Sequence, residues 1–341
     1  MSGSVLLAPV VTAPTVPARL TPTLADVQSW ARAWDEALYG AGGFYRGSAG
    51  PAGHFATATH GVPGRALART LANLASELGA DGVVDLGAGR GELLEALREV
   101  GFAGALTGCD VVERPTSLSP GIGWVRSPGG ARLPGVEQVA QAGAVPLGRA
   151  LVVAHEWLDV VPCTIAEVDP HGRLRTVEVD ASSRERLGQE PVRAEQEWAH
   201  RWWPERDPGS RVEIGLARDE AWATMLERWR PLAAVAIDYG HTRESRPRHG
   251  TLTGYREGRA VPPVPDGSGD LTAHVAVDSL RQSTRLLGRE AVRRWGPSSA
   301  LPDPREASTD PSRYLQGLAD AGATTSLTGH PFGDFWWVIA R

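Results

Sequence analysis

Residues 83–92 constrain the fold of this chain more than any other segment. Two valines precede an acidic residue, Asp85, and glycines then alternate with other residues at positions 87, 89 and 91. The residues from Glu92 to Arg98 have the apolar spacing of a helix. The pattern predicts a strand, a tight turn and a helix N-terminus, an arrangement in which a ligand can approach bare backbone.

The spacing of these glycines indicates which ligand fits. A dinucleotide-binding turn reads G-x-G-x-x-G, whereas here the third glycine comes one residue earlier. This favours a ligand that carries a nucleoside and a charged amino-acid end over a pyrophosphate, because Asp85 would face the ammonium group and the glycines would admit the sugar. S-adenosylmethionine has this chemistry. The alternative is a turn that only packs closely and binds nothing.

Strand and helix patterns alternate along most of the chain. Helices are predicted at 24–38, 64–78, 92–100 and 216–229, and strands at 82–86, 104–109, 122–126, 150–154, 233–238 and 335–340. This alternation predicts an α/β fold with a mostly parallel sheet and helices on both faces. A weaker strand at 323–328 is predicted to form a C-terminal antiparallel hairpin with 335–340.

Composition excludes several other classes of protein. The formal net charge is -5, which argues against a nucleic-acid partner. All 35 basic residues are arginine, so lysine chemistry is excluded. The 2 cysteines are too few for a disulfide framework or a cysteine-rich metal site, and no metal is expected. No run reaches the roughly 18 apolar residues that span a bilayer, and we expect a cytoplasmic protein without a membrane partner.

Acidic residues end several of the predicted strands. In open α/β sheets ligands bind at the carboxyl ends of the strands, and those ends carry Asp85, Asp110, Glu156 after His155, and Asp238 before Tyr239. Asp110 ends the strand that follows the glycine turn, where a carboxylate can accept both hydroxyls of a ribose. The alternative for Asp110 is a helix or turn cap.

Glu156 and Asp159 form the second strong pattern. They follow a buried strand and are three residues apart, so they share a face if the chain turns helical there. Two carboxylates beside a sulfonium cofactor could bind a cationic substrate or take its proton, and a guanidinium is the geometrically favoured partner. The alternative is that Asp159 caps a short helix before Pro162.

Taken in order, these and later residues resemble the MidA family of S-adenosylmethionine-dependent methyltransferases, which includes a mitochondrial assembly factor that methylates an arginine. The resemblance covers most of the chain, and its later blocks are more specific than the glycine motif. The matching blocks are 44–46, 53–58, 85–91, 155–162, 212–214, 237–240, 250–255 and 269–275.

The resemblance implies a Rossmann-like class I methyltransferase fold, S-adenosylmethionine as cofactor and a protein substrate, with arginine the most specific guess. Glu156 and Asp159 would be catalytic. The cofactor-binding residues would be Phe55, Thr57, Asp85, Gly87, Ala88, Gly89, Gly91, Asp110 and His155. The substrate-binding residues would be Glu213, Asp238, Tyr239, Tyr255, Asp270 and His274. The chain departs from the family pattern at His155, where the family usually has asparagine, and at His54, where it usually has aspartate.

The expected organisation has three parts. Residues 1–22 would be a flexible tail, 23–80 a helical segment that covers the cofactor, and 81–341 the methyltransferase domain with insertions at about 163–212 and 241–330. Residues 241–274 are expected to be a long loop rich in arginine, glycine and proline. Two other functions stay open: a cofactor-binding assembly protein or chaperone with little turnover, and a small-molecule methyltransferase. A homodimer is an open alternative to a monomer.

Overall fold

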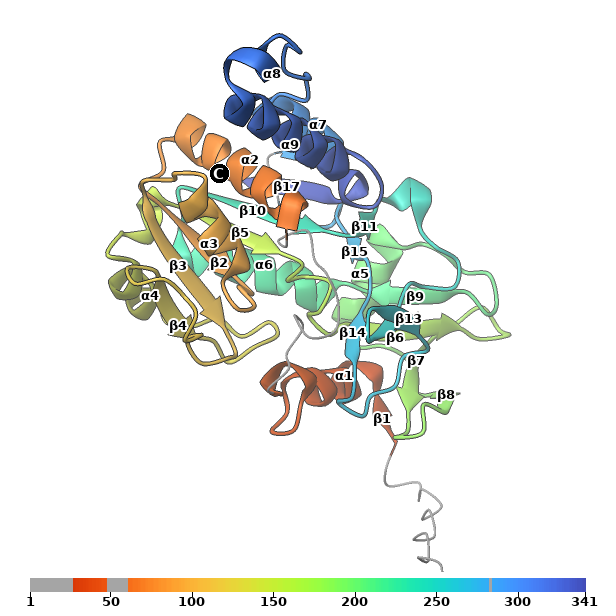
Figure 1. Cartoon of the computed structure of the whole chain (residues 1–341). Coiled ribbons are helices and arrows are strands. Elements are labelled where there is room, and N and C mark those ends of the chain that lie inside the picture. The colour runs from red at the N-terminus through yellow and green to blue at the C-terminus, as the bar shows by residue number, and fades with distance from the viewer. Residues whose placement is uncertain (1–26, 48–60, 282–283) are drawn as a thin grey trace, which may run out of the picture.

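A seven-stranded sheet forms the centre of the molecule (Figure 1). The computed structural model describes residues 27–47, 61–281 and 284–341. In spatial order the strands are β16 (Thr284–Leu287), β17 (Trp336–Ala340), β10 (Ala233–Asp238), β5 (Ala150–His155), β2 (Gly82–Leu86), β3 (Ala105–Asp110) and β4 (Gly123–Arg126). The strands from β10 to β4 are parallel, and β17 runs antiparallel to both β10 and β16. The predicted α/β fold with a mostly parallel sheet is confirmed.

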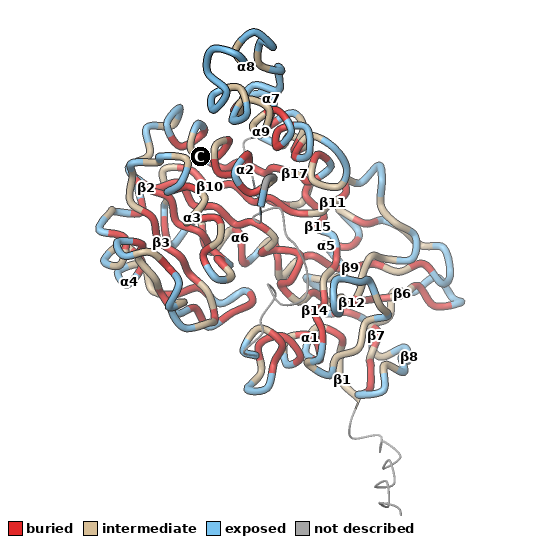
Figure 2. The backbone as a smooth tube through the Cα atoms, in the orientation of Figure 1, coloured by how far each residue is buried: buried red, intermediate tan, exposed pale blue. Residues whose placement is uncertain are grey.

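Helices cover both faces of this sheet because its central strands are apolar on both sides. One face carries α2 (Gly61–Leu78), α3 (Glu92–Glu99), α7 (Gly288–Trp295) and α9 (Pro311–Thr328). The other carries α4 (Val136–Gly143) and α6 (Leu216–Trp229). Along β5, Leu151 and Val153 face the first group, whereas Val152 and Ala154 face the second. Figure 2 shows the resulting continuous buried centre.

The prediction of a C-terminal hairpin is wrong, because only the second of its two strands, β17, forms. Residues 323–328 lie in helix α9, and the partners of β17 are β10 and β16. Threonines favour strands, but here Thr324 and Leu327 lie three residues apart on the buried face of a helix. The Thr324 hydroxyl donates to the carbonyl of Asp320 at 2.8 Å, a bond that a threonine inside a helix can make.

A second, antiparallel sheet lies beside the first. It contains β1 (Gln28–Ser29), β7 (Leu174–Val179), β6 (Thr164–Val168) and β9 (Arg211–Ile214), with β8 (Glu185–Leu187) paired to β7. Helix α5 (Arg193–Trp202) follows β8, and helix α1 (Trp30–Tyr39) follows β1. The predicted helix at 24–38 therefore begins later, at Trp30, because Ser29 caps it by accepting the Arg32 N–H at 3.4 Å.

Residues 241–274 are more ordered than the predicted loop. They contain β12 (Thr253–Arg256), which pairs with β13 (Arg259–Val261) on one side and β14 (Asp270–Thr272) on the other. Two further short strands, β11 (Gly240–His241) and β15 (Val275–Ala276), pair in parallel. The sequence hid these strands because each has only two to four residues, fewer than periodicity needs. The remaining short helices are η2 (Phe44–Arg46), η4 (Leu147–Arg149), η5 (Arg243–Ser245), α8 (Glu306–Thr309) and η6 (Phe332–Asp334).

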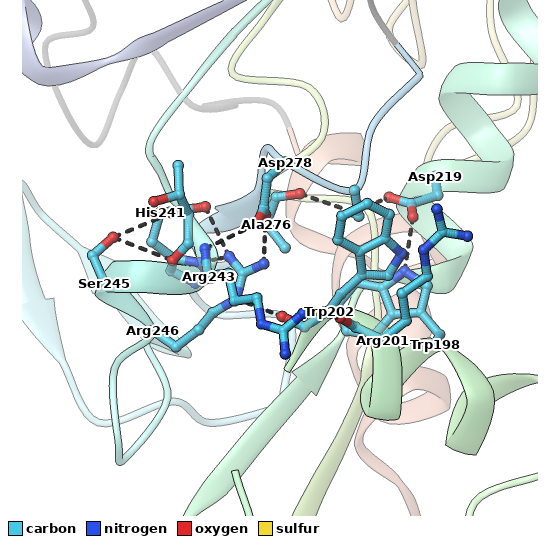
Figure 3. Close-up of polar contacts among 12 residues, drawn as sticks. Trp198, Arg201, Trp202, Asp219, His241, Arg243, Ser245, Arg246, Ala276 and Asp278 are labelled. Carbon is cyan, nitrogen blue, oxygen red and sulfur yellow. Dashed lines mark hydrogen bonds and ion pairs between the residues drawn. The ribbon is translucent and has the colours of Figure 1, made fainter. Parts of the chain in front are cut away.

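An ion pair anchors the arginine-rich start of this segment (Figure 3). The Arg246 guanidinium contacts the Asp278 carboxylate and donates to the carbonyl of His241 at 2.8 Å. Asp278 also accepts the Arg243 backbone N–H at 2.8 Å. Two of these arginines thus serve the local fold. No helix in the described part of the chain is long and apolar enough to cross a membrane.

Candidate functional site

The glycine turn joins β2 to α3 at the carboxyl end of the sheet. Gly87, Gly89 and Gly91 have φ angles of 82°, 58° and 86°. These angles lie in the left-handed region that L side chains avoid, so glycine is the residue that makes the turn without strain. A Cβ atom on Gly87 would also lie 3.5 Å from the Trp157 side chain. The turn therefore leaves bare backbone facing the space above β2.

Asp110 lies beside this turn, at the end of β3. Its Oδ2 accepts the Gly89 N–H at 2.8 Å, and its Oδ1 accepts the Val112 N–H at 3.3 Å. Burial raises the pKa of Asp110 to about 6, although these hydrogen bonds oppose the rise. A carboxylate has about four acceptor positions, so Asp110 keeps capacity for the two hydroxyls of a ribose.

Asp85 is the residue before the last in β2, and it is buried. Burial, and then the charges of Asp110 and Glu92, raise its pKa to about 8. A carboxylate in that environment is stabilised by a bound cation. The position therefore suits the ammonium group that the sequence pattern assigned to it.

Replacing Asp85 with asparagine is expected to stabilise the ligand-free protein in a pH-dependent way. Because the pKa is raised on folding, wild-type stability falls as pH rises from about 4 towards about 8. The variant should therefore melt several degrees above the wild type at pH 8.5 and close to it at pH 4.5 (roughly 2–4 °C per kcal/mol). Thermal unfolding at both pH values measures this, and an equal difference at both would contradict it.

One pocket connects the glycine turn with the acidic residues of the neighbouring strand. Its walls come from β2, β3, β5, the segment after β4, and the N-terminal residues that follow α1. The residues that line it include Tyr39, Tyr45, Asp85, Gly87, Ala88, Gly89, Asp110, Ser127, Gly129, Gly130, His155, Glu156, Trp157, Asp159 and Asp270. The sequence analysis assigned no role to Tyr39, Tyr45, Trp157 or the 127–130 segment. Tyr45 and Trp157 lie in the matching blocks 44–46 and 155–162, whereas no motif marks Tyr39 or residues 127–130.

Glu156 follows β5 in an unusual backbone conformation. Its φ is 51°, and its N–H donates to the carbonyl of Ile237 at 2.9 Å. Left-handed φ at a non-glycine residue is strained and is common at functional sites. Burial raises the pKa of Glu156 to about 8, with further contributions from Asp159 and Asp270. Its Oε1 lies 3.7 Å from Nε2 of His155.

Asp159 and Asp238 form a buried carboxylate pair. The Asp159 N–H donates to Asp238 Oδ1 at 3.2 Å, and the Thr272 hydroxyl donates to Asp159 Oδ2 at 2.9 Å. The other oxygens, Asp159 Oδ1 and Asp238 Oδ2, have no hydrogen-bond partner among the described residues. Burial raises the pKa of both groups, and the charge of Asp159 raises that of Asp238 further.

Asp270 is the third carboxyl group at this end of the pocket, after Glu156 and Asp159. It accepts the Tyr45 hydroxyl at 2.7 Å, and burial raises its pKa to about 7. Since Tyr45 follows α1 and Asp270 lies in β14, this bond joins the N-terminal segment to the small sheet. Glu156, Asp159 and Asp270 therefore meet in one pocket although they come from segments more than 100 residues apart.

Arg218 is a buried cation behind these carboxylates. From α6 it donates to the carbonyls of Asp159 at 2.8 Å, Val161 at 2.9 Å, and Ala273 and His274 both at 3.0 Å. Its guanidinium also lies 5.5 Å from the centre of the Trp34 ring. Arg218 thus joins the loop that carries Asp159 to the turn after β14. No pattern in the sequence distinguishes Arg218 from the other arginines of the chain.

Replacing Arg218 with methionine is expected to destabilise the protein by about 3 kcal/mol or more, because buried carbonyls lose their donors. Urea unfolding measures the change. Arg193→Met is the matched control, since the Arg193 side chain is 93% exposed and forms an ion pair with the exposed Glu197. A loss of similar size in both variants would contradict the role of Arg218.

The other predicted site residues lie around the pocket or away from it. Glu213 is buried and accepts the Thr251 hydroxyl and the Leu252 N–H, both at 2.7 Å. The Tyr239 ring lies 4.0 Å from Phe335 and 5.7 Å from His274, while Tyr255 is half-buried on β12. None of these four lines the pocket described above. His54, Phe55 and Thr57 lie outside the described residues. Among the residues that the structure describes, no cluster of three potential metal ligands occurs.

Comparison with known proteins gives one family model and a set of similar folds. Residues 134–293 match a model described as "Putative S-adenosyl-L-methionine-dependent methyltransferase". This span includes Glu156, Asp159, Asp238 and Asp270, and it excludes the glycine turn. No curated protein matches the chain.

Two similar solved structures come from Burkholderia thailandensis and belong to one superfamily. An uncharacterised protein is 22% identical, with a TM-score of 0.65, and the match covers 93% of this chain and 88% of that one. The other is described as a "likely methyl transferase" bound to S-adenosyl-homocysteine. It is 21% identical, with a TM-score of 0.62 and the same coverage. At these identities the two structures show a shared fold.

The fold and the family model agree with the sequence analysis. The chain has a mixed α/β fold with a large, mostly parallel sheet, similar to that of S-adenosylmethionine-dependent methyltransferases. The predicted enzyme class, an S-adenosylmethionine-dependent methyltransferase, and the predicted cofactor are confirmed.

Proposed function

We propose that this enzyme methylates an arginine side chain of a protein and that its main sheet has the class I methyltransferase arrangement. The strand order from β4 to β16, with one antiparallel strand next to the edge, supports the arrangement. The glycine turn, Asp85 and Asp110 would hold the cofactor. The acceptor would bind at the other end of the pocket, beside Glu156, Asp159 and Asp270.

The observation that carries the arginine proposal is the set of carboxyl groups at that end. Burial raises the pKa of each of them, so each is stabilised by a cation that enters the pocket. Asp159 Oδ1 also lacks a donor within the described part of the chain. A guanidinium brings a positive charge and five N–H donors in a plane, which satisfies both needs.

The same groups can handle the proton that the reaction releases. When bound, S-adenosylmethionine supplies an electrophilic methyl group. Transfer forms an N–C bond at the acceptor, breaks a C–S bond whose electrons stay on sulfur, and removes one proton from the guanidinium. Glu156, with a pKa raised to about 8 in the free protein, would become ionised beside the cationic acceptor and then take this proton. Asp159 would hold the guanidinium in line with the methyl group.

The test is methyl transfer to matched acceptors. The purified enzyme is incubated with S-adenosylmethionine that carries a labelled methyl group and with capped Gly-Arg-Gly, capped Gly-Lys-Gly, free arginine or a protein extract. Label on arginine in the peptide or in extract proteins is the expected result, and mass spectrometry locates it. Label confined to lysine or to small metabolites would overturn the proposal.

A further inference from the structure

His155 occupies a position where the fold calls for an apolar residue. It is the last residue of β5 and follows Leu151 and Val153 along the face that packs against α2, α7 and α9. Its ring stacks on Phe335 with centroids 6.1 Å apart, and apolar side chains such as Leu67 and Ile237 surround the same space. A leucine there would complete the core, so the imidazole needs another explanation.

The imidazole carries an unpartnered nitrogen at the pocket wall. Only 6% of the His155 side chain is exposed, and its Nε2 makes no hydrogen bond within the described residues. A buried polar atom without a partner costs about 1–3 kcal/mol. The Glu156 Oε1 is 3.7 Å from Nε2, and a shift of less than about 1 Å would bring the two atoms to hydrogen-bonding distance.

We propose that His155 is a positioning residue for Glu156: its Nε2 accepts a hydrogen bond from the Glu156 carboxyl group whenever that group carries a proton. Glu156 follows His155 directly with a strained φ of 51°, and its carboxyl group lies next to the imidazole. The bond satisfies both polar groups and directs the second carboxyl oxygen of Glu156 towards the acceptor. Its role in methyl transfer rests on the proposed function.

The surroundings of the pair favour a neutral histidine that accepts. Burial lowers the pKa of His155 to about 4, so the ring is uncharged near neutral pH. Besides burial, the charges of Asp159 and Asp270 raise the pKa of Glu156. Asp238 ends the neighbouring strand β10, and Tyr239 follows it. Arg218 is the cation behind this group, and its guanidinium donates hydrogen bonds to backbone carbonyls. A protonated Glu156 beside a neutral His155 is therefore the expected state of the ligand-free pocket.

Proton transfer from the acceptor would restore the same pair. The proton that leaves the guanidinium moves to the Glu156 oxygen that faces the acceptor. Rotation of the carboxyl group about its Cγ–Cδ bond then lets the resulting O–H donate to His155 Nε2. Because this bond stabilises the protonated form, it makes Glu156 a stronger base at the moment of transfer. The proton passes from Glu156 to solvent when the next cationic acceptor binds.

The experiment is an NMR titration of the Glu156 carboxyl carbon in the ligand-free enzyme. His155→Phe keeps the ring stack on Phe335 and removes Nε2, and Glu156→Gln assigns the signal. Loss of the acceptor should lower the titration midpoint of Glu156 by about 1 pH unit. A more apolar neighbour that acted only through burial would raise the midpoint, so the sign of the change separates the two roles.

Two further measurements make the test independent of the acceptor. His155→Gln presents a side-chain oxygen that can accept the same bond, so it should return the midpoint towards the wild-type value. Thermal unfolding should show that both variants are folded, with a cooperative transition like that of the wild type. An unchanged or raised midpoint in His155→Phe overturns the pairing, whatever the acceptor is. A lowered midpoint in an enzyme that labels no arginine would leave the pairing intact and refute the proposed function.

Discussion

Replacing Glu156 with glutamine is expected to reduce methyl transfer by at least about 100-fold, the usual contribution of a positioned general base. The amide keeps the size of the side chain but can neither carry a negative charge nor take the acceptor's proton. The affinity for S-adenosylmethionine should change by less than about threefold, because the glycine turn, Asp85 and Asp110 stay intact. Transfer of labelled methyl groups and calorimetric titration measure the two quantities separately.

The matched control is Glu137→Gln in α4, because Glu137 is exposed and does not line the pocket. It should leave both quantities unchanged. If Glu156→Gln instead loses cofactor affinity, Glu156 belongs to the cofactor site and the acceptor proposal needs a different base. Retention of full transfer activity would remove Glu156 from the mechanism.

Replacing Gly87 with arginine is expected to abolish binding of S-adenosylmethionine, with an affinity loss of at least about 100-fold. The φ of 82° suits glycine, and an added side chain would begin 3.5 Å from Trp157 and extend into the pocket. It would also bring a positive charge towards a cationic ligand. Calorimetric titration with S-adenosylmethionine and S-adenosylhomocysteine measures the loss, and NADH should bind to neither protein.

Gly101→Arg is the control for backbone strain. Gly101 has a similar φ of 84°, it is exposed, and an added Cβ would contact nothing within 4 Å. This variant should lose a similar amount of stability through its backbone, yet bind the cofactor as the wild type does. Normal cofactor binding by Gly87→Arg would show that the glycine turn does not hold S-adenosylmethionine.

The cofactor end of the site was predictable because its residues are close in sequence. The strand, the alternating glycines and the helix all lie between residues 82 and 99, and local sterics favour glycine where φ is positive. Asp110 was also accessible, since the carboxyl ends of parallel strands meet at one edge of the sheet. The helix at 323–328 was missed because its conformation depends on distant contacts. Burial against α2 and α7 outweighed the strand preference of its threonines.

The sequence by itself determined the parallel sheet, the glycine turn and the two carboxyl groups after β5, since each depends on short-range periodicity and backbone geometry. Only the tertiary structure decided which distant groups join them. It brought Tyr45 to Asp270, Thr272 to Asp159, and Arg218 to the carbonyls behind the pocket. These contacts depend on how β14, α6 and the segments after α1 and β5 pack together. Packing of elements far apart in the chain leaves no local pattern for sequence analysis to detect.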